Sequence, residues 1–190
     1  SGLVHNPGGS DRVNSLQNED SLSLGSGTDT LNLTMGNNND NGGTEIAPIL
    51  NSVEVVNVQF TSEAPNGVQG GAFTGELNLE FSDGTQEVNV DRMIGDNTAA
   101  YSVIGMESAT DTLSVSGAPN DAILEFNYRE GAVEGPGDTL ALDLSGVRLS
   151  DLSVTIGNRN DAAEDEEMSF EVVNITTGGN YANVDKFTFT

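Results

Sequence analysis

The stretch that decides the fold reads Gly25-Ser26-Gly27-Thr28-Asp29-Thr30-Leu31-Asn32-Leu33. Glycine adopts positive φ and lets the backbone approach a ligand closely. Aspartate offers a hard anionic oxygen of the kind that calcium prefers. Leu31 and Leu33 alternate with polar residues, which predicts a strand with one buried face. The stretch therefore predicts a turn with potential metal ligands that leads into a half-buried strand.

The same frame recurs along the first forty residues at a spacing of nine. It places a polar oxygen donor at Asp11, Asp20, Asp29 and Asn38, and an aliphatic residue stands two positions after each aspartate. Fixed-period repetition of this kind is typical of stacked β architectures. Plain turns between strands are the alternative interpretation, because Asp, Asn and Gly dominate turns in general.

Composition narrows the classes of function. The chain of 190 residues has 30 acidic and 6 basic side chains, a net charge of -24, no cysteine and one histidine. Such a surface repels nucleic acid and anionic lipids, and no apolar run is long enough to span a bilayer. Without thiolates or several histidines, a metal site has to use oxygen ligands. Ca²⁺ is the cofactor that this composition favours.

Residues 6 to about 40 resemble the calcium-binding nonapeptide array of repeats-in-toxin (RTX) proteins, which Gram-negative bacteria secrete. The resemblance implies a β-roll in which two nonapeptides complete one coil. Asp11 and Asp29 would then lie on one edge, and Asp20 and Asn38 on the other. In the best copy Gly25 and Gly27 would supply carbonyl ligands. The Asn-rich run 37–43 that follows, which contains Asp40, either extends the calcium sites or forms a solvated loop.

A second repeat extends beyond the nonapeptides. The pattern Asp-[Ser/Thr]-Leu followed by an alternating strand begins at Asp20, Asp29, Asp111 and Asp138. A partner pattern, Glu-Val-Val-Asn, occurs at 54–57 and 171–174, with a shorter echo at 87–90. The alternation resembles bacterial surface-layer proteins and large secreted adhesins. It implies irregular calcium-linked β-solenoid coils, with Asp111 and Asp138 as further ligands.

The remaining pattern indicates strands and turns. Leu77, Leu79 and Phe81 alternate with polar residues before the turn sequence 82–85, which predicts an antiparallel hairpin with the strand at 87–90. A short helix is conceivable only at 99–106. The expected fold is all-β. It is either an irregular calcium-binding β-solenoid that begins as a β-roll and contains the hairpin as an insertion, or a β-sandwich preceded by a short β-roll. Residues 1–43 would form the roll and residues 44–190 a β-rich domain continuous with it.

Two polar groupings carry further hypotheses. Five carboxylates, Asp161, Glu164, Asp165, Glu166 and Glu167, fall within seven residues. They either hold an intermolecular divalent ion or form a solvated face. Asn57, Asn89 and Asn174 share a Val-Asn-Val/Ile setting. They either form an asparagine ladder on stacked coils or point outward independently.

The sequence favours a structural function over catalysis. The only histidine, His5, lies in a glycine-rich terminus without a rigid scaffold, and the chain has no tryptophan platform for carbohydrate. We expect an extracellular, calcium-stabilised protein that assembles with itself into a surface layer or matrix. The alternatives are an extension or binding module of a large RTX adhesin and the export domain of a secreted enzyme. The resemblance implies the cell surface of a Gram-negative bacterium, type I secretion and cell-surface polysaccharide as a second partner.

Overall fold

The structure is a computed structural model of the whole chain, and it describes residues 3–5, 12–18, 20–36, 44–61, 75–93, 100–118, 122–133, 136–147, 152–158, 170–178 and 184–189. These residues form strands, turns and loops without a helix. The prediction of an all-β chain is therefore confirmed. Among the described residues there is also no helix that is long and apolar enough to cross a membrane.

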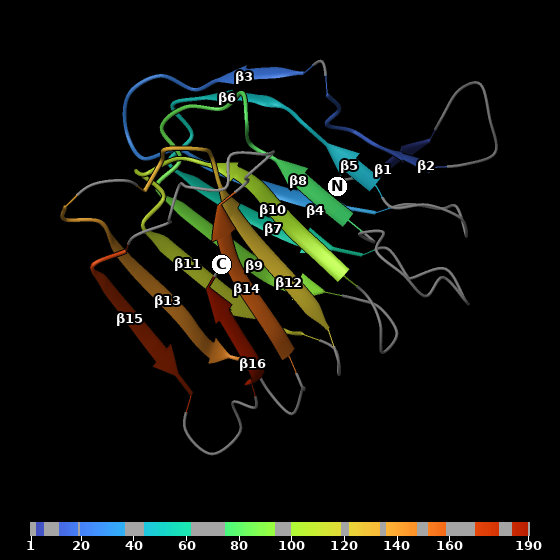
Figure 1. Cartoon of the computed structure of the whole chain (residues 1–190). Helices are drawn as coiled ribbons and strands as arrows, with labels where there is room; N and C mark the ends of the chain where they lie inside the picture. Colours follow the sequence, from blue (N-terminus) through green and yellow to red (C-terminus); the bar gives the residue numbers. More distant parts are fainter. Residues whose placement is uncertain are drawn as a thin grey trace.

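Most strands belong to two parallel sheets of six strands each (Figure 1). Sheet 1 has the order β15 (Val172–Thr177), β13 (Thr139–Gly146), β11 (Thr112–Ser116), β9 (Glu87–Met93), β7 (Val55–Phe60) and β4 (Thr30–Met35). Sheet 2 has the order β16 (Val184–Phe189), β14 (Leu152–Asn158), β12 (Ile123–Tyr128), β10 (Ala100–Met106), β8 (Gly75–Asn78) and β5 (Thr44–Ile46). Every neighbouring pair in both sheets is parallel.

The chain alternates between the two sheets as it advances. From β7 onward each strand of sheet 1 is followed by a strand of sheet 2, and the next pair is added beside the previous one. In Figure 1 the colour accordingly runs from blue at one end of the stack to red at the other. A third side is formed near the N-terminal end by β3 (Ser21–Ser23) and β6 (Ile49–Asn51), and it continues to Asp83 through a bridge with Asn51. The parallel sheets are consistent with a β-roll or solenoid-like all-β fold.

The core lies between the sheets because alternate residues of each strand point inward. In β7 the residues Val56, Val58 and Phe60 are buried, while the residues between them are half-buried. Phe60 stacks on Tyr101 of β10 with ring centroids 4.8 Å apart. Gly75 of β8 makes room for this pair, since an added Cβ would lie 2.8 Å from the Phe60 ring. One continuous hydrophobic cluster therefore joins the two sheets along the stack.

The predicted antiparallel hairpin at 77–90 is wrong. β8 pairs with β5 and β10 in sheet 2, whereas β9 pairs with β7 and β11 in sheet 1. The turn between them carries the chain from sheet 2 to sheet 1. Its hydroxyl groups bind the neighbouring turn, since the Ser82 Oγ donates to the Pro48 carbonyl at 3.1 Å and the Thr85 Oγ1 to the Val53 carbonyl at 3.1 Å. Alternation and turn composition were identified correctly, but the pairing partners were not.

Two smaller expectations also fail. The run 99–106 does not start a helix, because Ala100–Met106 forms β10 with Tyr101, Val103 and Met106 in the core. The coils do not follow an eighteen-residue nonapeptide period either. β4 stacks on β7 and β3 on β6, so Thr30 is in register with Val55 and Ser21 with Ile49. These pairings join strands that lie on either side of residue 43 in the sequence.

The N-terminal end of the stack is covered by residues 14–16. Leu16 is buried in the core cluster, and the Asn14 Oδ1 accepts the Gly36 N–H at 3.0 Å just after β4. Upstream, β1 (Leu3–His5) and β2 (Arg12–Asn14) form an antiparallel pair. These contacts leave the inward residues Leu33 and Met35 of β4 buried although β4 is an edge strand.

Candidate metal-binding corner

The two sequence patterns meet at the corner where the chain enters sheet 1. Thr30 is in register with Val55, and Thr139 is in register with Val172. The strands that begin after Asp29 and Asp138 therefore each lie beside a Glu-Val-Val-Asn strand of the next coil, whereas the strand after Asp111 lies between β9 and β13.

The glutamate of the second pattern binds the aspartate of the first through the backbone. The Glu54 Oε2 accepts the Asp29 N–H at 2.7 Å. The Glu171 Oε2 accepts the Asp138 N–H at 2.7 Å and the Gly137 N–H at 2.9 Å. Hydrogen bonds to a carboxylate are stronger than those between neutral groups. The sequence analysis noted the Glu-Val-Val-Asn repeat but missed the role of its glutamate.

Asp29 is the described acidic residue whose environment best suits a cation. Its Oδ2 is buried and has no hydrogen-bond partner. The Glu54 carboxylate lies at the same corner, bound to the Asp29 N–H. The preceding turn contains Gly25 at φ 98° and Gly27 at φ 137°, and nothing lies within 4 Å of a Cβ added at either position. The donor chemistry therefore fits an oxygen-ligated ion such as Ca²⁺.

The other described candidates have different surroundings. The Asp20 Oδ2 accepts the Gln17 N–H at 2.8 Å and thereby closes the local turn 17–20. Asp111 is exposed, and its Oδ1 accepts the Thr112 hydroxyl at 2.9 Å. Asp138 is half-buried beside Glu171. Within the described ranges no group of three or more acidic or histidine side chains converges on one point.

Several predicted ligands lie outside the described residues. They are Asp11, Asn38 and Asp40 from the roll, together with Asp161, Glu164, Asp165, Glu166 and Glu167 from the acidic run.

The predicted asparagine ladder exists in part. On the outer face of sheet 1 the Asn57 Nδ2 donates to the Asn32 Oδ1 at 2.8 Å, and the Asn89 Nδ2 donates to the Asn57 Oδ1 at 2.8 Å. The Ser114 hydroxyl continues the series by donating to the Asn89 Oδ1. Asn174 shares the outer face but is in register with Ala141, so it stands apart from the ladder. The ladder links four consecutive coils.

Arg129 joins three coils where strands of sheet 2 end. Its Nε donates to the Gly105 carbonyl at 2.8 Å and its Nη1 to the Glu107 Oε1 at 2.6 Å. Its Nη2 donates to the carbonyls of Leu79 and Ser82. Sequence reasoning missed this residue, because a single arginine in a loop carries no pattern.

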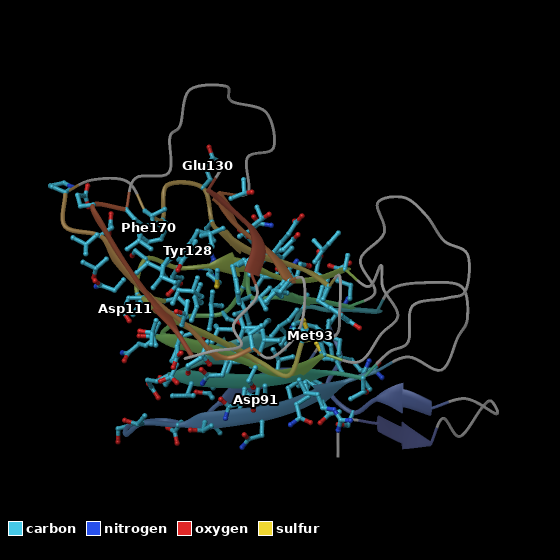
Figure 2. All side chains as sticks on the ribbon, turned by 90° about the horizontal axis from the view of Figure 1, so that it is seen from below. Asp91, Met93, Asp111, Tyr128, Glu130 and Phe170 are labelled. Atoms are coloured by element: carbon cyan, nitrogen blue, oxygen red, sulfur yellow. The ribbon has the colours of Figure 1, made fainter. Side chains whose placement is uncertain are left out.

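Aromatic contacts close the same side of the core. Tyr128 and Phe170 meet edge to face with centroids 5.2 Å apart, and Figure 2 shows the two rings lying close together. The Tyr128 hydroxyl donates to the Thr110 carbonyl at 2.7 Å. Burial, together with the nearby Asp111 charge, raises the pKa of Tyr128 well above its usual range. These residues join neighbouring coils through packing and a hydrogen bond.

Comparison of the chain with protein-family models, with curated proteins and with solved structures gave no match.

Proposed function

We propose that the chain is an extracellular, calcium-stabilised structural protein that assembles with copies of itself into a surface layer or matrix. The observation that carries the calcium part is the buried, unpartnered Oδ2 of Asp29. An anionic oxygen removed from water without a partner is costly, and a bound cation offsets that cost. Asp29, the Glu54 carboxylate and carbonyl groups of the 25–27 turn would hold the ion.

The arrangement of the described contacts supports a structural role. The Asn32–Asn57–Asn89–Ser114 ladder, the Arg129 clamp and the glutamate contacts at the corner all join one coil to the next. Their common effect is to hold adjacent coils in a fixed register. A net charge of -24 makes such a stack dependent on counterions, and calcium bridges carboxylates better than sodium does. Export by a type I route and anchoring to cell-surface polysaccharide complete the proposal.

Denaturation experiments test the metal site. Asp29→Asn and wild-type protein are unfolded in EGTA and, separately, in millimolar calcium. Without calcium, Asp29→Asn should be at least as stable as wild type, because it removes an unpaired buried charge. Calcium should raise the denaturation midpoint of wild type and of Asp83→Asn, since Asp83 is exposed in a turn. An equal calcium response in Asp29→Asn and wild type would contradict the site.

Light scattering and electron microscopy test the assembly. The purified chain should form large assemblies in calcium and remain small in sodium at matched ionic strength, because sodium screens charge but does not bridge two carboxylates. An elongated monomer under both conditions would favour the adhesin module instead.

A further inference from the structure

Two asparagines of the chain stand in the acceptor pattern for N-linked glycosylation. The pattern is Asn-x-Ser/Thr with any residue except proline in the middle. It occurs as Asn32-Leu33-Thr34 and as Asn174-Ile175-Thr176, and no other asparagine in the sequence is followed by serine or threonine two positions later. Because so short a pattern also arises by chance, its setting in the fold decides what it means.

Both patterns lie on the outer face of sheet 1. Asn32 and Thr34 are alternate residues of β4, so they share one face of the strand. Leu33 between them is buried and Asn32 is exposed, which identifies that face as the outer one. The same alternation in β15 places Asn174 and Thr176 on the outer face, and both are exposed. A sugar attached to either asparagine would therefore extend into solvent.

The openness of this face does not depend on a strand's place in the stack. Neighbouring coils meet at the edges of their strands, so a coil beside β15 or β4 covers an edge and leaves the outer face free. Ala141 of the interior strand β13 is in register with Asn174 and is exposed. Asp143 of the same strand is in register with Thr176 and is also exposed.

The amide nitrogens distinguish the two acceptors from the other asparagines of this face. The Asn57 Nδ2 donates to the Asn32 Oδ1, and the Asn89 Nδ2 donates to the Asn57 Oδ1 and to the Glu87 Oε1. Within the described residues, the Nδ2 atoms of Asn32 and Asn174 donate no hydrogen bond. The asparagines with a free amide nitrogen are therefore the two that have threonine two positions later. Asn57 and Asn89 have glutamine and aspartate there.

The chemistry of N-glycosylation is compatible with the ladder. It replaces one hydrogen on the asparagine Nδ2 and leaves the side-chain carbonyl unchanged. The Asn32 Oδ1 can therefore still accept the hydrogen bond from the Asn57 Nδ2 at 2.8 Å. A sugar on Asn89 would instead displace a hydrogen bond, because both hydrogens of its Nδ2 are used.

We propose that Asn32 and Asn174 are N-glycosylated and carry their glycans on the outer face of sheet 1. The donor is a sugar whose anomeric carbon is bonded to a phosphate group, on either a nucleotide or a lipid carrier. The asparagine Nδ2 forms a bond to the anomeric carbon, and the bond from that carbon to the phosphate oxygen breaks. The phosphate leaves with the electron pair, and one amide proton passes to a base of the glycosyltransferase.

Peptide mapping by mass spectrometry of the protein from its native source tests the proposal. Peptides with Asn32 and with Asn174 should carry mass increments of whole sugar units, whereas Asn57 and Asn89 should be unmodified. One large increment would indicate an oligosaccharide transferred as a block from a lipid carrier. A series of one-sugar increments would indicate single sugars from nucleotide donors. Both results support the proposal.

Substitution of the threonines tests whether the pattern directs the modification. Thr34→Val and Thr176→Val keep the asparagine and the shape of the side chain but remove the hydroxyl. Each variant, produced in the native source, should lose the sugar at its own site and keep it at the other. Thr34→Ser is the matched control, because it preserves the pattern and should keep the sugar on Asn32.

Unmodified Asn32 and Asn174 in the native protein would overturn the proposal, and modification of only one would overturn it for the other. A mass increment that persists in the valine variants would also overturn it, because the modification would then not depend on the pattern. So would an increment that persists in Asn32→Gln or Asn174→Gln at the same site, since the sugar would then be on another side chain. Calcium has no part in these outcomes, so they are separate from the test of the metal site.

Discussion

A single guanidinium holds together turns that the chain order separates widely. Arg129 and Glu107 form the ion pair found among the described residues, at 2.6 Å, with side chains 22% and 24% exposed. The same guanidinium also binds carbonyls of Leu79, Ser82 and Gly105. A planar group with several donors is suited to binding carbonyls from more than one coil. Because the Arg129 side chain is only partly exposed, its removal leaves those carbonyls without a hydrogen-bond donor of similar strength.

We expect Arg129→Ala to lower the free energy of unfolding by about 2–4 kcal/mol, because it leaves a carboxylate and several carbonyls unsatisfied. Urea denaturation measures the change. Arg92→Ala is the control, since Arg92 is exposed and a surface substitution of this kind costs less than about 0.5 kcal/mol. Similar losses for the two variants would show that the clamp contributes little.

Tyr128 should make stability depend on alkaline pH. Its folded-state pKa is raised above the unfolded value, so its contribution is complete below about pH 10 and is lost as the pH rises toward the folded-state pKa. At pH 8 the free energy of unfolding of Tyr128→Phe should be about 1–2 kcal/mol lower than that of wild type, because the Thr110 carbonyl loses its hydrogen-bond donor. At pH 11 the difference in the free energy of unfolding between wild type and Tyr128→Phe should be smaller by about 1.4 kcal/mol than at pH 8.

The comparison requires denaturation midpoints of wild type and Tyr128→Phe at both pH values. Leu124→Val serves as a control, because it perturbs the same buried strand without a titrating group. A gap between Tyr128→Phe and wild type that stays constant with pH would argue against the buried phenol as the cause.

At the element scale, the outer face of sheet 1 is held by side chains as well as by backbone. Asn89 lies at the centre of the ladder: it donates to the Asn57 Oδ1 and to the Glu87 Oε1 at 2.7 Å, and it accepts from the Ser114 hydroxyl. In parallel stacking the same side chain recurs at the strand spacing of about 4.8 Å, which suits amide-to-amide hydrogen bonds. The ladder thereby fixes the register of β4, β7, β9 and β11.

We expect Asn89→Ala to cost about 1–2 kcal/mol of stability, since both neighbours lose a partner. Asn174→Ala should change stability by less than about 0.5 kcal/mol, because its register partner is Ala141. Thermal or chemical denaturation of the two variants gives the answer. Equal effects would mean that the amides act as independent surface groups.

At the scale of the whole molecule, charge opposes the compact stack. The net charge of -24 favours expansion through self-repulsion, and monovalent salt screens that repulsion. The Debye length falls from about 30 Å at 0.01 M to about 8 Å at physiological ionic strength. Stability in EGTA should therefore rise with sodium chloride over this range.

Denaturation midpoints at low and physiological sodium chloride measure this effect. The double variant Asp91→Asn, Asp143→Asn, which removes two exposed charges from the outer face of sheet 1, should show a smaller salt response. In addition, hydrogen bonds from Ser145 hold the pKa of Asp143 below its usual value, so its stabilising contribution is present at neutral pH and lost as the pH falls through that pKa. An equal change in denaturation midpoint with salt for wild type and the double variant would exclude charge repulsion as the cause.

The sequence by itself determined the all-β class and the alternating pattern of several strands. These properties depend on local alternation, as in Leu113 and Val115 of β11 or Val56 and Val58 of β7. It also identified Asn57 and Asn89 as ladder candidates and Asp29 as the first residue to examine for a cation. These conclusions required only local alternation and the comparison of repeated motifs.

The tertiary structure alone decided which strands pair. The residues at 77–90 satisfy the local signature of a hairpin, yet Leu77 and Val88 occupy opposite walls of one core, and each strand pairs with its equivalent in the adjacent coil. Glu54 meets Asp29 and Arg129 meets Leu79 across 25 and 50 residues, respectively. Coil lengths vary, with ladder partners 25 or 32 residues apart, so no fixed period in the sequence predicts these contacts. They arise from stacking, which depends on how all coils share one core.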